Sequence, residues 1–73
     1  MKISSLEIKE IRIEASKLIK VNTTIREGQA VYIAAQDKFP KAVLRLKNTK
    51  YDCFYEDSRI ELFLLELQKY DAK

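Results

Sequence analysis

Residues 58–70 read SRIELFLLELQKY, and this stretch decides the fold. Its apolar residues recur with the spacing of one helix face, a stripe made of Ile60, Phe63, Leu64, Leu67 and Tyr70. The hydroxyl of Ser58 precedes Glu61 by three residues, a pattern typical of a capping box at a helix start. The stretch therefore predicts an amphipathic helix over residues 58–70 that buries this stripe.

Two further capping patterns divide the rest of the chain. Ser4 precedes Glu7 by three residues, and Thr24 precedes Glu27 by the same distance. Each hydroxyl can accept from a backbone N–H at the helix start while the Glu side chain reaches back, so both pairs predict helix starts. Residues 10–14 alternate as a strand would, but the alternation does not extend upstream, and a helix is favoured there.

Pro40 is expected to end the second helix and begin a third, because proline suits the first helical position and disfavours helical geometry before it. Val43, Leu44 and Leu46 should pack from this third helix. Gly28 lies inside the second helix and, together with Ala34 and Ala35, offers a surface of small residues that another backbone could approach closely. The chain is thus predicted to be all-α, a compact bundle of three to four short helices in one domain over residues 1–73, with helices at 5–20, 24–39, 40–47 and 58–70.

The composition narrows function mainly by exclusion. The 73 residues include no His, one Cys and one Gly, with a net charge of +3. The commonest general base, a Cys/His zinc set and a glycine-rich phosphate loop are therefore missing, and we expect a non-enzymatic protein with no cofactor and no metal. No apolar run approaches the length of a membrane span, and the first residues lack the apolar core of a signal peptide. We expect a cytoplasmic protein with no membrane partner.

Some apolar residues fall outside the predicted core stripes. Leu6 and Ile13 lie on the opposite face of the first helix, and Leu62 and Leu65 on that of the last. The irregular segment 48–57 adds aromatic rings with large contact area. These features predict a protein interface, with Leu6 and Ile13 as a homodimer seam; its residues are Tyr51, Tyr55, Leu62, Leu65, Leu6 and Ile13. The alternative is that the third helix and the aromatic segment cover these side chains as one more wall of the core.

A basic stretch precedes an acidic one. Five cations and no acid occur from residue 38 to residue 50: Lys38, Lys41, Arg45, Lys47 and Lys50. Residues 51–66 then hold five acids and one Arg. The cations could contact successive phosphates, so nucleic-acid binding is the alternative function, against the simpler interpretation of a solvated cationic face.

The acidic stretch is expected to serve local structure. Asp52 should cap a turn, and Asp57 and Ser58 should serve the start of the last helix. Cys53 should pack as a small apolar residue, with its pKa raised by nearby acids.

Residues 26–60 resemble small uncharacterised proteins encoded by tailed bacteriophages. The matching positions are Gly28, Gln29, Ala30, Pro40, Thr49, Asp52, Phe54, Tyr55, Asp57, Arg59 and Ile60; Asn48 stands where the pattern has Gly, and Cys53 where it has Pro. The resemblance implies a phage origin and no specific activity. By analogy with other small phage proteins, we expect an inhibitor or adaptor that binds a host protein, a phage protein or a second copy of itself.

Overall fold

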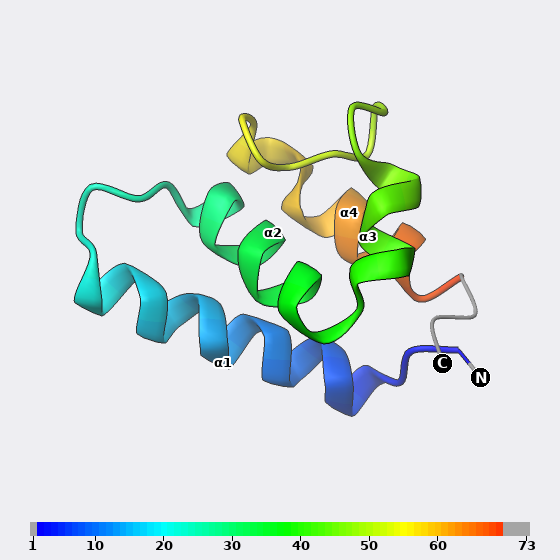
Figure 1. Cartoon of the computed structure of the whole chain (residues 1–73), viewed down its shortest axis with the longest axis horizontal. Coiled ribbons are helices and arrows are strands. Elements are labelled where there is room, and N and C mark those ends of the chain that lie inside the picture. The colour runs from blue at the N-terminus through cyan, green and yellow to red at the C-terminus, as the bar shows by residue number, and fades with distance from the viewer. Residues whose placement is uncertain (1, 70–73) are drawn as a thin grey trace.

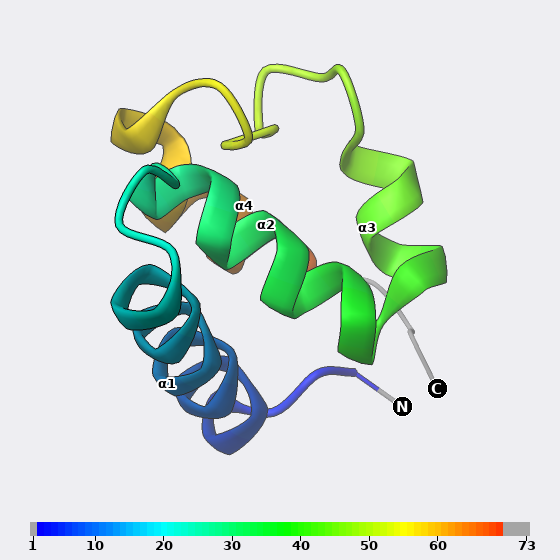
Figure 2. The ribbon, with the colours of Figure 1, turned by 60° about the vertical axis from the view of Figure 1, so that its left-hand side comes forward.

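A computed structural model describes residues 2–69, which form an all-α fold. Its elements, in chain order, are α1 (Ser5–Val21), α2 (Glu27–Lys38), α3 (Pro40–Leu46), a 3-10 turn (Asp57–Arg59) and α4 (Ile60–Leu67). α2 lies at the centre, packed against α1 on one side and against α3 and the 3-10 turn on others (Figure 1). After a rotation of the molecule, the 3-10 turn still lies beside the start of α2, with α3 at the far edge (Figure 2). The predicted helical fold is confirmed.

The capping box at the start of α1 forms as predicted. Ser4 Oγ accepts from the Glu7 backbone N–H at 3.2 Å, and Glu7 Oε1 accepts from the Ser4 N–H at 2.9 Å. Ile11 and Ala15 are buried on the side facing α2. Residues 10–14 are helical, so the strand alternative is wrong.

The predicted capping box at Thr24 is wrong, and α2 begins later, at Glu27. Asn22 Oδ1 accepts from both the backbone N–H and the hydroxyl of Thr24, at 3.2 and 2.7 Å. The Thr24 side chain therefore stabilises the turn after α1 and does not cap α2. The start of α2 is capped across space instead. Asp57 Oδ1, 29 positions along the chain, accepts from the Gly28 N–H at 2.9 Å. The Asp57 side chain was expected to stabilise the start of the last helix, whereas it caps the start of α2.

Phe39 and Pro40 form the corner between α2 and α3. The Phe39 N–H donates to the Ala35 carbonyl, and its carbonyl accepts from the Val43 N–H, so one buried residue ends α2 and begins α3. From α3, Val43 is buried while Leu44 is 67% exposed. The expectation that Leu44 packs into the core is therefore wrong, because it lies on the outer side of this short helix.

α4 buries the predicted stripe at Ile60, Phe63, Leu64 and Leu67, while its last member, Tyr70, lies outside the described residues. Ser58 does not cap it, since Ser58 lies within the preceding 3-10 turn and Arg59 precedes the helix without a side-chain cap. The predicted helix end at residue 70 lies outside the described residues. Phe63 is fully buried, with its ring centroid 5.8 Å from that of Tyr32 on α2. This contact joins α4 to the central helix.

Candidate functional site

The outward sides of α1 and α4 carry exposed aliphatic side chains. Leu6 is 68% and Ile13 48% exposed on α1, while Leu62 is 50% and Leu65 58% exposed on α4. On each helix these residues lie opposite the buried stripe, since side chains three, four and seven positions apart share a helix face. The alternative in which they form another wall of the core does not occur. We call Leu62 and Leu65 the α4 face, and Leu6 and Ile13 the α1 face.

Ion pairs border the α4 face. Glu61 on α4 pairs with Arg12 on α1, and Glu66 Oε1 accepts from Lys69 Nζ at 2.8 Å. The Arg12–Glu61 pair is exposed, so its contribution to stability is small. The pair links the edge of α1 to the edge of α4, and it covers neither the α1 face nor the α4 face.

The two predicted interface tyrosines do not lie on either face. Tyr51 is partly buried against the core, with Lys50 Nζ 5.3 Å from its ring centroid. Tyr55 is 72% exposed and meets the Phe54 ring edge-on at a centroid distance of 4.7 Å. Both belong to the loop between α3 and the 3-10 turn, residues 47–56, which forms a site of its own.

Several hydrogen bonds hold this loop in place. Asp52 caps a turn as predicted: its two carboxylate oxygens accept from the N–H groups of Asn48 and Phe54, at 2.7 and 2.9 Å. Arg26 Nη1 donates to the Tyr55 carbonyl at 3.0 Å, which ties the loop to the residue preceding α2. The loop is therefore fixed both within itself and to the central helix.

The closest approach of the loop to α2 is at Gly28. A Cβ placed on Gly28 would lie 2.2 Å from the Cys53 carbonyl oxygen and 2.9 Å from Asp57 Oδ1. The expectation that Gly28 admits a neighbouring backbone is confirmed. Gly28, Asp52 and Asp57, three positions of the phage-protein resemblance, thus have structural roles here.

Asn48 adopts a left-handed backbone conformation, with a φ of 61°. Such a φ favours Gly and is tolerated by Asn, which accounts for an Asn where the phage pattern has Gly. We expect Asn48→Gly to leave the free energy of unfolding within about 0.5 kcal/mol of wild type, and Asn48→Ala to lower it by about 1 kcal/mol. Urea unfolding of the two variants tests this. Equal destabilisation by both would contradict the strain argument.

Cys53 is fully buried, as predicted, and its Sγ donates to the Gly28 carbonyl at 3.3 Å. Burial raises the pKa of the thiol from 9.0 to about 12, and Asp52 adds to the rise. Above about pH 9 the unfolded chain loses this proton while the folded chain keeps it, so stability falls as pH rises toward the folded pKa.

The raised pKa of Cys53 predicts a measurable pH dependence. Between pH 8 and pH 10, wild type should lose about 1.4 kcal/mol more of its free energy of unfolding than Cys53→Ala, which lacks the thiol. Chemical denaturation at both pH values measures the difference. Identical slopes in the two proteins would show that the thiol ionises equally well in the folded chain.

A groove lies between α2 and the loop. Its volume is about 250 Å³, and its lining consists of aromatic, amide and charged side chains: Tyr32, Gln36, Lys47, Asn48, Asp52, Phe54 and Tyr55. A smaller hollow of about 170 Å³ adjoins it, sharing Asn48, Asp52 and Tyr55 and adding Arg59. The sequence placed Tyr55 and Lys47 in two different candidate sites, and the fold brings them to one groove.

The predicted basic residues Lys38, Lys41, Arg45, Lys47 and Lys50 are all exposed. Among the described residues, no carboxylate lies within ion-pair distance of Lys38, Lys41 or Lys47. Of the five acids that follow in sequence, four are engaged elsewhere, in a turn, a helix cap and two ion pairs, and Glu56 forms no ion pair among the described residues. The chain therefore presents a cationic surface at α3 that its own acidic stretch does not neutralise.

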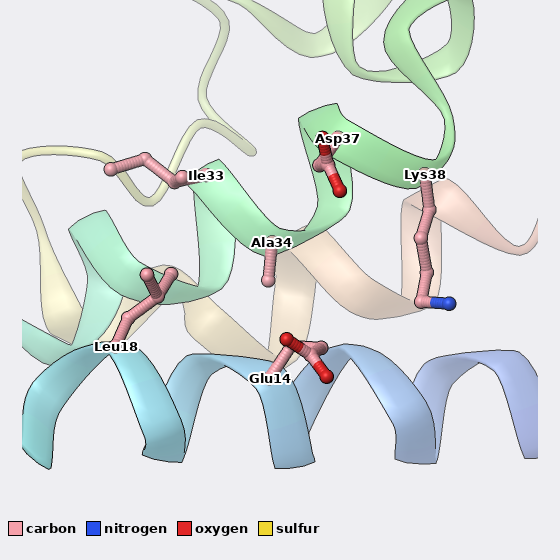
Figure 3. Close-up of a pocket in the computed structure, with 6 residues that line it drawn as sticks. All are labelled: Glu14, Leu18, Ile33, Ala34, Asp37 and Lys38. Carbon is pink, nitrogen blue, oxygen red and sulfur yellow. The ribbon is translucent and has the colours of Figure 1, made fainter. Parts of the chain in front are cut away.

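A wider opening lies between α1 and α2. Its volume is about 530 Å³, and Figure 3 shows Leu18 and Ala34 on its apolar side with Glu14, Asp37 and Lys38 around it. Glu14 is engaged by Lys17 Nζ at 3.4 Å. Two carboxylates and one ammonium group at an open trough form no catalytic or anion-binding arrangement.

Searches of the described residues reveal no group of three or more Cys, Asp or Glu side chains placed to hold a metal ion. Within the same part of the chain, every helix falls short of the length and apolarity that crossing a bilayer requires.

Comparison with known proteins finds a protein to which this chain is similar. Over 70 residues, 88% of this chain, it is 36% identical to a membrane protein–large ribosomal subunit bL9 fusion protein of Aster yellows witches'-broom phytoplasma (strain AYWB). The chain spans only 8% of the length of that relative. No protein-family model matches the sequence, and no solved structure matches it.

Proposed function

We propose that this chain is a non-enzymatic protein-binding module that acts in the cytoplasm as an inhibitor or adaptor. The observation that carries the proposal is the exposure of Leu62 and Leu65 on α4, supported by Leu6 and Ile13 on α1. Each side chain is about half exposed or more, so covering it is worth about 1 kcal/mol. Leu62 and Leu65 together supply about 2 kcal/mol, or about thirty-fold in Kd, and a partner that also covered the α1 face would gain a similar amount again.

The charges around the α4 face indicate what kind of protein covers it. Glu61 and Glu66 flank Leu62 and Leu65 in the helical sequence. Because Glu61 pairs with Arg12 and Glu66 with Lys69, a second copy docked α4 against α4 would place identical ion pairs opposite each other and gain no new charge complementarity. A different protein that presents an amphipathic helix, with a leucine seam and a lysine rim, fits the α4 face better. The resemblance of this chain to phage-encoded proteins supports a host or phage protein as the partner that presents this helix.

A designed amphipathic helix tests this function. We expect a fluorescein-labelled peptide with leucines on one face and lysines beside them to bind the full chain, and Leu62→Ser/Leu65→Ser to weaken binding about thirty-fold, equivalent to about 2 kcal/mol. Because the contact is apolar, the loss should persist between about 50 and 200 mM salt.

Leu44→Ser/Val21→Ser is the matched control, because it removes two exposed aliphatic side chains of other helices, 67% and 88% exposed. This control should bind the peptide like wild type. Equal losses in both double variants would contradict the proposal. A concentration-dependent dimer that Leu62→Ser/Leu65→Ser abolishes would overturn the choice of occupant in favour of a second copy.

Nucleic-acid binding is the second candidate function. Its support is the pair of exposed cations Lys41 on α3 and Lys47 directly after it, neither of which lies within ion-pair distance of a described carboxylate. The ribosomal-protein part of the fusion relative makes RNA the nucleic acid to test first. Binding of this kind should weaken steeply between about 50 and 200 mM salt, and the absence of binding at low salt would exclude it.

A further inference from the structure

We propose that the groove between α2 and the loop receives an unpaired nucleobase, so that the nucleic acid bound by this chain is single-stranded. The proposal rests on the second candidate function, nucleic-acid binding, and gives it a specific site and ligand. It starts from Tyr55, which lines the groove and is 72% exposed.

The exposed ring is presented rigidly. Tyr55 meets Phe54 edge-on at 4.7 Å, and Phe54 meets Tyr32 of α2 edge-on at 5.2 Å, so three rings extend from the core to the surface. The backbone on either side is fixed, since Asp52 accepts from the Phe54 N–H and Arg26 donates to the Tyr55 carbonyl. A fixed, exposed aromatic face is the kind of platform on which bases stack in single-stranded nucleic-acid complexes.

The groove also offers groups that recognise a base edge. The side-chain amides of Gln36 and Asn48 line it, and neither makes a hydrogen bond within the described part of the chain. Each amide carries two donors and one acceptor, which suits the edge of an unpaired base. The groove volume of about 250 Å³ lies below the range of sites for drug-sized ligands, so it fits a base rather than a whole nucleotide.

The charges around the groove indicate on which side the phosphates of a bound strand leave it. Lys47 lines the groove directly after α3, which carries Lys41 on its exposed side. At the opposite end, the adjoining hollow is lined by two carboxylates, Asp52 and Glu56, against one cation, Arg59, so it attracts a phosphate less than the α3 side does. The phosphates therefore leave the groove toward α3. A duplex does not fit this arrangement, because its bases are stacked on each other and hidden from Tyr55.

Fluorescence anisotropy with the full chain tests the site, using labelled oligouridylate of about ten nucleotides and, as the duplex, a labelled G·C-rich RNA of about twenty base pairs, both at about 50 mM salt. We expect the single strand to bind at least ten-fold more tightly than the duplex. Tyr55→Ala should weaken single-strand binding at least ten-fold without changing its salt dependence, whereas Tyr55→Phe, which keeps the ring, should bind like wild type.

Two lysine variants separate the groove from the cationic surface. Lys41→Ala should lower the salt dependence by about one phosphate contact, and Lys9→Ala, the same change on α1, should have no effect. If Lys41→Ala weakens binding and Tyr55→Ala does not, the groove proposal fails while nucleic-acid binding stands. Equal affinity for the duplex also overturns the groove. If neither nucleic acid binds at low salt, both proposals fail together.

Discussion

Gly28→Ala is expected to lower the free energy of unfolding by about 3 kcal/mol. In most helices this change stabilises by about 1 kcal/mol, because alanine is the better helix former. Here the added methyl group would lie 2.2 Å from the Cys53 carbonyl oxygen, so the loop must move away from α2. That movement costs overpacking strain and breaks the hydrogen bond from the Gly28 N–H to Asp57. Urea unfolding followed by circular dichroism measures the loss.

Ser16→Ala provides the control for helix propensity. Ser16 is exposed in the middle of α1, so the substitution should leave stability unchanged or raise it slightly. Asp57→Ala should reproduce part of the Gly28→Ala loss, about 1 kcal/mol, because it removes the same cap without adding a methyl group. A Gly28→Ala protein as stable as wild type would show that the loop does not contact α2 as closely as described.

Phe63→Ala is expected to lower the free energy of unfolding by about 4 kcal/mol. Phe63 is fully buried in α4 and packs on the Tyr32 ring of α2, so truncation removes buried apolar surface and leaves a cavity. A chain of this length has about 4–11 kcal/mol of stability in total, so the variant should keep at most about 7 kcal/mol and unfold at a clearly lower temperature than wild type. Thermal unfolding followed by circular dichroism is the measurement.

The neighbouring residue supplies a matched control. Leu62 lies on the same helix but is 50% exposed, and Leu62→Ala should cost less than about 1 kcal/mol. Similar losses for the two variants would mean that the helix face assigned to the core is incorrect. The comparison also shows that the α4 face can be altered for binding studies without unfolding the chain.

Local patterns predicted most of this fold. The capping box at Ser4 and the apolar stripe of α4 depend on residues a few positions apart, and both occur in the structure. The same helical spacing placed Leu62 and Leu65 opposite the core stripe but left open whether other segments cover them, and the structure shows both exposed. Pro40 marked the start of α3 correctly because its effect on the backbone is local.

Contacts between distant residues were not predictable in the same way. Thr24 and Ser58 matched the capping pattern, but Asn22 engages Thr24, and Ser58 lies within a 3-10 turn. The actual cap of α2 comes from Asp57, and no rule of sequence spacing connects it with Gly28.

In the candidate sites, too, local spacing predicted some features, and contacts between distant residues determine the others. Helical spacing placed the aliphatic residues of α1 and α4 on outward faces, whereas the groove depends on tertiary packing. Tyr55 and Lys47 belong to it together with Tyr32 and Gln36 of α2, residues 15 or more positions away from Tyr55. A lone Gly inside a helix was the one sequence signal that the loop packs closely against α2.

The most direct test of the proposed function is to map where the amphipathic leucine–lysine helix binds, by following backbone amide chemical shifts of the isotope-labelled full chain during titration. We predict that the shifts concentrate on α4 and on the exposed side of α1, around Leu62, Leu65 and Ile13, with the loop around Tyr55 unchanged. Shifts confined to α3 and the loop, with α4 unaffected, would contradict the proposal that these apolar faces bind a partner protein.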